Sequence, residues 1–398
     1  MRRALPFIAI GIVVLGLIVG AFFMFFSGKP SITVGEPNPF VGAGDREPTT
    51  TTTGPIEGAG TIVAPHLIRI ADGPVAEGAV ALRIQGPILS SSTPALEDTE
   101  VRYIERQNGN VFAFRLHDRT LTRISNKTLP GVVSAVWVPD GSRVFARFSA
   151  STAGTEELAT YSLKADGGEG YFLEPNLSTV GITGSSTVFT LLAGSSGSVA
   201  SVAPVGATAA TRLFASPLAA ITLQPFGANF VATTKASAEV GGYAFSVARS
   251  TGVFTRVLGP LTGLSTLPDT KGKYVLFSHV YRGKLILSVR DTVSQTTIQL
   301  PVATLAEKCV WTEDSSSIYC GVPTAIPQNL PDSWYQGTAE FSDRLWRIDM
   351  DSRIATLVVD PKTVADVAID MISLTQDSAG DALVFTNRID GSLWAYDF

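Results

Sequence analysis

The sequence has few of the residues that bind metals or form covalent intermediates. Its 398 residues include two cysteines and three histidines, and neither type occurs at the short spacings that hold zinc. Charged residues make up only 16% of the chain, the formal net charge is −5, and no dense group of lysines and arginines occurs. Because nucleic acids are bound through such basic groups, no nucleic-acid partner is expected.

Signatures of common enzyme classes are missing as well. No glycine-rich phosphate loop follows a strand-like segment and opens a helix, and no Gly-x-Ser-x-Gly motif of the hydrolase kind occurs. His66, His117 and His279 lie far apart in the sequence and form no catalytic grouping. The sequence therefore predicts a protein that is not an enzyme, with no cofactor, no bound metal and no catalytic residues.

One long hydrophobic run is present, near the N-terminus. Leu5 to Phe26 is 22 residues without a charged side chain, and as an α-helix of about 33 Å it would cross the ~30 Å hydrocarbon core of a membrane. Arg2 and Arg3 precede it, which predicts a cytoplasmic N-terminus with the rest of the chain outside. A cleaved signal peptide is the alternative, but its apolar core is typically shorter. We expect residues 1–29 to be a cytoplasmic stub and a single-pass anchor in the cell membrane.

The next segment, residues 30–65, is rich in proline, glycine and threonine and contains a run of threonines at 49–53. Such a composition buries too little apolar surface to offset the entropy lost on ordering. We expect a flexible tether that holds the remainder of the chain away from the membrane.

Four strand-like segments recur along the rest of the chain. Successive units are 41 to 45 residues apart, except for a last step of 65, so the sixth unit carries about twenty extra residues. A period of roughly 40–45 residues made of strands alone is typical of a β-propeller. The second strand of each unit centres on Tyr103, Phe145, Phe189, Phe230, Val275, Tyr319 and Val384.

The second unit shows the pattern most plainly. Its strands are expected at 132–138, 143–148, 158–164 and 171–174, and Pro139-Asp140-Gly141-Ser142 supplies the first turn. The seventh unit ends one strand short, and residues 66–71 resemble the outer strands of other units. We therefore expect an all-β, seven-bladed propeller over residues 66–398, closed by an N-terminal strand that completes the last blade.

The stretch Trp137-Val138-Pro139-Asp140-Gly141-Ser142-Arg143-Val144-Phe145-Ala146 is similar to the repeat of TolB-type, WD40-like (PD40) bacterial propellers. That resemblance implies an envelope protein-interaction module. The chain departs from the TolB type, because it has an anchor and lacks a separate N-terminal α/β domain. In this respect it resembles uncharacterised membrane-anchored bacterial propellers, to which no activity is assigned.

The extra residues of the sixth unit are the candidate binding segment. Their aromatic and acidic side chains are of the kind that bind proteins or sugars, because aromatic rings give large contact areas at low entropy cost. The alternative is that Trp334 and Tyr335 fold back and plug the loop or the channel mouth. The candidate binding residues are Asp332, Trp334, Tyr335, Gln336, Phe341 and Asp343.

Cys309 and Cys320 fall in the first two strands of the sixth unit. If Trp311 faces Ile318 across the turn, the two cysteines face each other and can form a disulfide outside the cytoplasm. The alternative is a pair of small buried apolar residues.

Three functions are compatible with these features. The favoured one is a membrane-anchored, extracytoplasmic scaffold that binds other proteins of the cell envelope. The first alternative is a binder of cell-surface glycans, based on the aromatic and acidic insert. A propeller hydrolase or lyase is the least favoured, since no suitable set of acids is found.

Overall fold

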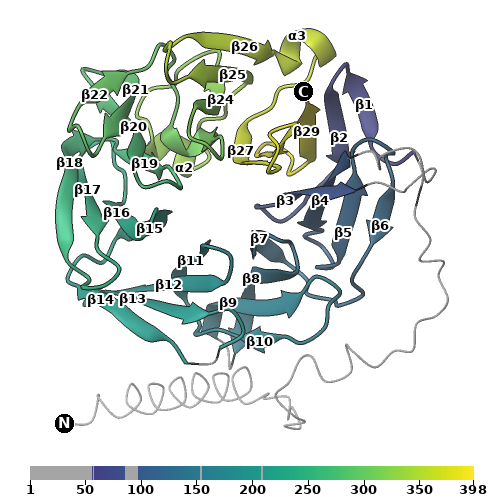
Figure 1. Ribbon diagram of the computed structural model, residues 1–398, viewed down its shortest axis with the longest axis horizontal. Helices are drawn as coiled ribbons and strands as arrows, with labels where there is room; N and C mark the ends of the chain where they lie inside the picture. The colour runs from purple at the N-terminus through teal and green to yellow at the C-terminus, as the bar shows by residue number, and fades with distance from the viewer. Residues whose placement is uncertain (1–55, 57, 86–96, 153–154, 208) are drawn as a thin grey trace, which may run out of the picture. The chain divides into compact units, whose positions relative to one another are not determined.

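The computed structural model describes residues 56, 58–85, 97–152, 155–207 and 209–398. The chain divides into two compact units, residues 1–47 and 48–398, and all described residues belong to the second. In that unit seven antiparallel sheets are arranged in a ring (Figure 1). The expected all-β, seven-bladed propeller is thus confirmed. Helix in the described residues is confined to three short segments, η1 (Ala306–Lys308), α2 (Asp332–Tyr335) and α3 (Pro361–Ala365).

Blades 1 to 6 are four-stranded sheets whose strands follow chain order. Blade 1 contains β3 (Val80–Gln85), β4 (Glu97–Ile104), β5 (Val111–Arg115) and β6 (Leu121–Arg123). Blade 2 contains β7 (Val132–Trp137), β8 (Arg143–Thr152), β9 (Thr155–Lys164) and β10 (Tyr171–Phe172). Blade 3 contains β11 (Leu177–Thr183), β12 (Thr187–Gly194), β13 (Gly197–Pro204) and β14 (Thr211–Ser216). Blade 4 contains β15 (Ile221–Phe226), β16 (Asn229–Thr234), β17 (Gly241–Val247) and β18 (Phe254–Thr262).

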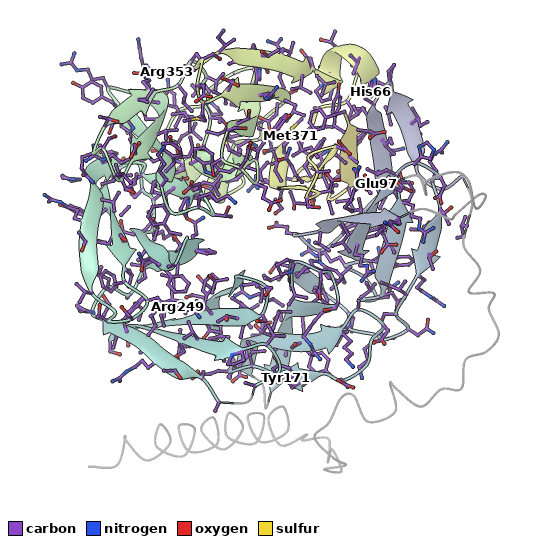
Figure 2. The ribbon with its side chains drawn as sticks, viewed as in Figure 1. His66, Glu97, Tyr171, Arg249, Arg353 and Met371 are labelled. Atoms are coloured by element: carbon purple, nitrogen blue, oxygen red, sulfur yellow. A yellow bond between two sulfur atoms is a disulfide. The ribbon has the colours of Figure 1, made fainter. Side chains whose placement is uncertain are left out.

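Blade 5 contains β19 (Ser265–Pro268), β20 (Tyr274–Tyr281), β21 (Lys284–Asp291) and β22 (Thr297–Gln299). Blade 6 contains β23 (Cys309–Trp311), β24 (Ser317–Pro323), β25 (Asp343–Asp349) and β26 (Ala355–Val359). Blade 7 combines both ends of the described chain, with β27 (Met371–Gln376), β28 (Ala382–Asn387), β29 (Leu393–Asp397), β2 (Leu67–Ala71) and β1 (Thr61–Ala64). Figure 2 shows Met371, which begins β27, toward the centre of the ring, and Arg353, in the β25–β26 turn, at its rim.

The ring closes through the N-terminal strand, as expected. Strand β2 pairs antiparallel with β29, with Leu67 opposite Tyr396 and Ile68 opposite Ala395. Blade 7 then carries a fifth strand, because β1 pairs with the outer edge of β2.

The structure corrects the expected C-terminal end of the tether. Residues 61–64, at the end of the expected 30–65 tether, form strand β1 of the propeller. Before them, Ile56 exchanges two backbone hydrogen bonds with Leu121, in the outer strand of blade 1. The N-terminal segment of the propeller therefore runs from blade 1 to blade 7 and covers the junction at which the ring closes.

The turn chemistry of the repeat explains why its weaker copies also form hairpins. In blade 2 the Asp140 carboxylate accepts hydrogen bonds from the backbone N and the hydroxyl of Ser142, and Gly141 adopts a φ of +67°. In blade 6, Asp314 accepts from the backbone of Ser316, and Ser315 takes the left-handed conformation, with a φ of +61°, that Gly141 has in blade 2. The aspartate is thus the shared element of the turn, and glycine is not required in every copy.

The expected anchor, Leu5 to Phe26, lies outside the described residues. Within the part of the chain that the structure describes, no helix combines the length and the apolar character needed to cross a bilayer.

Candidate functional site

The extra residues of blade 6 form an arm that is tied to other blades. This insert arm, residues 324–342, connects β24 to β25 and contains the single turn α2. At its far end the Asp332 carboxylate accepts a hydrogen bond from the backbone N of Ala238, in the β16–β17 loop of blade 4. Its apolar side chains join a buried cluster made of Leu285, Leu305, Leu330, Trp334, Phe341 and Ile372. The arm is therefore packed against the ring from blade 4 to blade 7.

The six candidate binding residues divide between the interior and the surface. Trp334, Phe341 and Asp343 are buried, with exposed fractions of 5%, 3% and 1%. Asp332 is half-buried, while Tyr335 and Gln336 are exposed. Trp334 thus folds back onto the ring, as in the alternative to a binding segment. Tyr335 does so only in part, because 38% of its surface remains exposed to solvent.

A fully buried lysine lies beneath the arm. The Nζ of Lys308 is 2.8 Å from Oδ2 of Asp343 and forms a second ion pair with Asp370. The same Nζ lies 4.8 Å and 5.2 Å from the ring centroids of Phe341 and Trp334. A charge removed from water is tolerated when it is paired and hydrogen-bonded. The two carboxylates satisfy this condition, so the network fixes the base of the arm to the starts of blades 6 and 7.

Asp370 connects this network to the arm itself. Its Oδ2 accepts hydrogen bonds from Nε1 of Trp334 at 2.9 Å and from the backbone N of Phe341 at 3.2 Å. Arg388 holds the other side of the indole, because its guanidinium lies 4.8 Å from the ring centroid and donates to the Trp334 carbonyl at 2.7 Å. Two charged residues therefore fix the position of Trp334: Asp370, which directly precedes β27, and Arg388, which follows β28.

Burial alters the acid–base properties of this region. It raises the pKa of Asp343 to about 6, although Lys308 acts in the opposite direction, and Oδ1 of Asp343 has no hydrogen-bond partner in the described part of the chain. Many protein atoms surround the Glu307 carboxyl group, although part of the residue is exposed to solvent. This partial burial raises the pKa of Glu307. The Tyr335 hydroxyl donates to Glu307, and burial followed by the negative charge of Glu307 raises the pKa of Tyr335.

The face around the arm carries exposed apolar side chains. The loops between the second and third strands of a blade, here called B–C loops, all lie on this face. In blades 4 to 7 these loops, together with Tyr281 at the end of β20, expose apolar side chains: Val240, Tyr281, Ile326 and Ile389 are exposed by 66%, 56%, 42% and 41%. A hollow of about 460 Å³ lies between the first three of these loops and is lined by Ala238, Arg282 and Ile326, among others.

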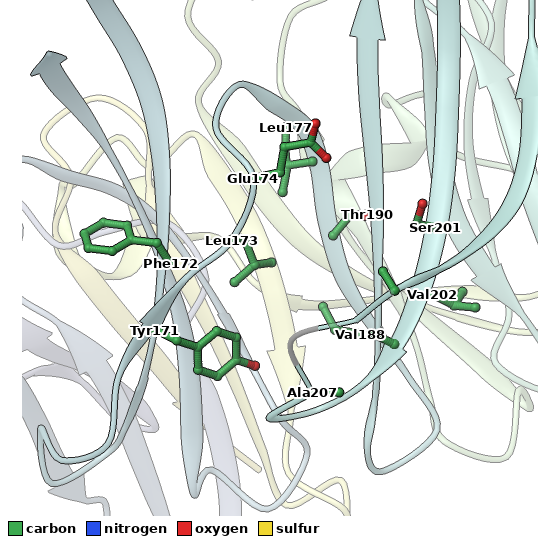
Figure 3. Close-up of a pocket in the computed structure, with 12 residues that line it drawn as sticks. Tyr171, Phe172, Leu173, Glu174, Leu177, Val188, Thr190, Ser201, Val202 and Ala207 are labelled. Atoms are coloured by element: carbon green, nitrogen blue, oxygen red, sulfur yellow. The ribbon is translucent and has the colours of Figure 1, made fainter. Parts of the chain in front are cut away.

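A second hollow, of about 260 Å³, lies between blades 2 and 3 (Figure 3). Its lining is mostly apolar, and Glu174 is the one charged residue among those that form it. Such a lining contains no set of reactive groups. Across the described residues, no three His, Cys, Asp or Glu side chains are placed so that they could hold a metal ion.

The two cysteines lie next to the buried network. The register pairs Trp311 with Ile318 and Cys309 with Cys320, as expected from the pairing in blade 2, and the cysteines are joined by a disulfide with Cα atoms 4.1 Å apart. Both are buried in the cluster between blades 5 and 6. The bond joins the first two strands of blade 6 directly after Lys308.

Sequence reasoning missed Lys308, Asp370 and Arg388. Lys308 and Asp370 are 62 residues apart and Arg388 lies in a further loop, so no short spacing joins the three into a motif. One signal was available, because Lys308 and Asp370 occupy the same position in successive blades, directly before the first strand. Charges at equivalent positions of successive blades meet at the centre of a propeller.

Comparisons with known proteins identify the fold and no family. No protein-family model matches the sequence, and no curated protein is significantly similar to it. An oligogalacturonate lyase in complex with manganese superposes with a TM-score of 0.53 at 8% identity, over 81% of this chain and 98% of the lyase. An oligogalacturonate lyase from Vibrio parahaemolyticus gives 0.52 at 10% identity, with the same coverage. TolB from Acinetobacter baumannii gives 0.44 at 10% identity, over 70% of this chain and 62% of that chain. Identities this low show a shared propeller fold alone.

Proposed function

We propose that the chain is a membrane-anchored, extracytoplasmic propeller that binds another protein of the cell envelope through the B–C loops of blades 4 to 7. The observation that carries this proposal is the exposure of Val240, Tyr281, Ile326 and Ile389 on four successive loops of one face. Removing such apolar surface from water is favourable, and large exposed apolar patches mark sites of protein association.

The fixed position of the insert arm supports the same proposal. The arm is held by the contact of Asp332 with blade 4 and by the buried pairing of Lys308 beneath it. A surface that is ordered before binding loses little entropy when a partner docks. The hollow of about 460 Å³ between the loops offers a place for an anchoring side chain of that partner.

The envelope location rests on the sequence. The apolar run from Leu5 to Phe26, with Arg2 and Arg3 before it, is the basis for an anchor and for an extracytoplasmic propeller.

The alternatives have less support. Glycan binding would use an open aromatic face, but the Trp334 indole is buried between Asp370 and Arg388 and is closed to a sugar ring. For a lyase or hydrolase, no set of catalytic acids is brought together among the residues that the structure describes, and the likeness to oligogalacturonate lyases extends to the fold alone.

Site-specific photo-crosslinking in living cells tests the proposal with the full-length chain. A photoreactive amino acid is placed at Tyr281 or Ile389 on the proposed face, and at Val253 or Val293 as matched controls. These controls are at least as exposed as the two test residues, but lie in turns between third and fourth strands, on the opposite face. We expect adducts with one identifiable envelope protein from Tyr281 and Ile389 and none from the controls. Adducts from both faces alike, or from neither, would contradict the proposal.

A further inference from the structure

A lysine and two aspartates meet in a closed site beneath the insert arm. The side chains of Lys308, Asp343 and Asp370 have no surface exposed to solvent. The Nζ of Lys308 contacts both carboxylates and also donates a 3.0 Å hydrogen bond to the Met371 carbonyl. A lysine amine enclosed in this way is a potential nucleophile, because an amine that has lost its proton attacks carbonyl carbon.

The carboxyl group of Asp370 is placed as the electrophile. Its Oδ1 pairs with Nζ of Lys308, so the nitrogen lies next to the carboxyl carbon. Its Oδ2 accepts hydrogen bonds from Nε1 of Trp334 at 2.9 Å and from the backbone N of Phe341 at 3.2 Å, and Nη1 of Arg388 lies 3.9 Å from it. Donors fixed on one oxygen stabilise the negative charge that develops there during nucleophilic attack. Oδ1, on the side of the amine, is then the oxygen that can leave.

Asp343 is placed to carry the proton. Its Oδ2 lies 2.8 Å from Nζ of Lys308 and accepts a 2.7 Å hydrogen bond from the backbone N of Met371. Its Oδ1 is buried and has no hydrogen-bond partner among the described residues, so this oxygen can receive a proton. Burial raises the pKa of Asp343 to about 6, although the positive charge of Lys308 acts in the opposite direction. A carboxyl group with such a pKa takes up and releases protons near neutral pH.

The surroundings of the three groups favour loss of water. The ring centroids of Phe341 and Trp334 lie 4.8 Å and 5.2 Å from Nζ of Lys308, and these rings keep bulk water away from it. An ammonium and a carboxylate are charged, whereas the amide that they form on condensation is neutral. Because a buried charge is costly to maintain, the closed site favours the amide.

We propose that Lys308 and Asp370 condense to an isopeptide bond, an amide between their side chains, which joins blades 6 and 7. Asp343 takes a proton from the Lys308 ammonium group, and the amine attacks Cγ of Asp370. The Nζ–Cγ bond forms and the Cγ–Oδ1 bond breaks. Oδ1 leaves as water with two protons of the former ammonium group, which Asp343 carries in turn. The two charges disappear together, so the reaction needs no oxidant, reductant or cofactor.

The bond fixes the base of the insert arm covalently. Lys308 ends η1, directly before β23, and Asp370 directly precedes β27, so the bond joins the starts of the first strands of two successive blades. The two residues are 62 positions apart, and a cross-link between them restricts the conformations of the unfolded chain. The proposal does not depend on the docking of a protein partner.

Mass spectrometry of the full-length chain tests this proposal after reduction and alkylation, which remove the contribution of the disulfide. The variant Lys308→Met, prepared in the same way, gives the mass of the unreacted chain. After correction for the substitution, we expect the wild type to be lighter by one water molecule. Trypsin should no longer cleave after Lys308, and residues 291–344 should be recovered joined to residues 363–388. The exposed ion pair of Lys362 with Asp366 is the control in the same digest, because cleavage after Lys362 should stay complete.

A second variant tests the role of the proton carrier. Asp343→Asn keeps the Lys308 amine and the Asp370 carboxyl group, and a cooperative thermal transition shows that it folds. We expect most of this variant to lack the bond, because acid–base catalysis typically contributes about a hundredfold or more to a rate. Complete bond formation in folded Asp343→Asn would overturn the role of Asp343. The proposal as a whole is overturned, without any need for this variant, if the wild type has the mass of the unreacted chain or if its two peptides are recovered separately.

Discussion

The indole nitrogen of Trp334 donates a 2.9 Å hydrogen bond to Oδ2 of Asp370, so the insert arm of blade 6 is fastened to the start of blade 7. Asp370 also pairs with the buried Lys308, and Lys308 pairs with Asp343, the first residue of β25 after the arm. One charge network thus holds both the middle and the end of the arm. The shape of the proposed docking face and the stability of the ring depend on the same few side chains.

Truncation of Trp334 should therefore reduce stability. For Trp334→Ala we expect the free energy of unfolding to fall by about 3–5 kcal/mol, the usual loss for a buried tryptophan. Trp334→Phe keeps an aromatic ring but loses the donor to the Asp370 carboxylate, and should cost about 1.5–3 kcal/mol, the range for a hydrogen bond to a charged group. Chemical denaturation measures both, with the exposed neighbour Gln336→Ala as a control near zero. Wild-type stability of Trp334→Ala, combined with loss of the partner crosslink, would instead make Trp334 a contact residue.

Lys308 should be more important than any of the surface charges. Lys308→Met leaves Asp343 and Asp370 buried with no basic partner other than Arg388, at 3.9 Å from Asp370, and removal of one member of a buried pair typically costs about 3–5 kcal/mol. Adding Asp343→Asn and Asp370→Asn to Lys308→Met removes the stranded charges and should recover part of the loss. If the triple variant is less stable than Lys308→Met by the sum of the separate effects, the three residues are not coupled.

The stability of the protein should depend on pH through the titration of Asp343. Burial raises its pKa to about 6, above the ordinary value of 3.8, so the folded state binds the proton more tightly than the unfolded state between these values. The contribution of this group to stability is complete below about pH 4 and is lost as the pH rises through 6. We expect the free energy of unfolding of the wild type, relative to Asp343→Asn, to increase as the pH falls from 7 to 4.5. A difference that is constant with pH, or that changes in the opposite direction, would show that Asp343 has no raised pKa.

Local signals in the sequence predicted most of the fold because each blade repeats them. Trp137 lies opposite Val144 in blade 2, and the same pairing, expected for Trp311 and Ile318 in blade 6, is found there. The extra strand β1 could not be predicted, since its four residues bury a single side chain, Ala64, and lack the alternation of a half-buried strand.

The candidate site was predicted less completely, for a physical reason. The insert was visible as twenty extra residues, but its environment is formed by Lys308 and Asp370, which are 62 residues apart in the chain. A sequence pattern records neighbours within one blade, whereas these contacts arise when blades 6 and 7 pack together. The burial of Trp334 follows from that packing and not from its own segment.

Loss of the disulfide should cost less than loss of Lys308. Cys309 and Cys320 are 11 residues apart, and closing so short a loop contributes at most about 3 kcal/mol on the entropy model. We expect the double variant Cys309→Ala, Cys320→Ala to fold and to melt at a lower temperature than the wild type. Intact mass after alkylation, with and without reductant, shows whether the bond forms in the cell. Alkylation of both cysteines in unfolded protein without reductant would show that it does not.

Removal of the last strand should have the largest effect of all. Deletion of residues 393–398 takes away β29, which lies between β28 and β2 in the five-stranded sheet of blade 7 and contains the buried Trp394. The N-terminal strands then have no partner in blade 7, and β28 becomes an open edge. We expect the truncated chain to aggregate or to lose its cooperative thermal transition, as followed by circular dichroism and size-exclusion chromatography.

Deletion of residues 61–64 is the matched control for this closure. It also removes one strand from blade 7, but β1 lies at the edge of the sheet, so β2 stays paired with β29 and the ring stays closed. The control should melt cooperatively at a somewhat lower temperature than the parent chain. A large difference between the two deletions is what closure through β29 requires, because the strands differ in their position in the sheet far more than in length. If the chain without residues 393–398 melts cooperatively near the parent temperature, the pairing of β2 with β29 does not hold the ring together.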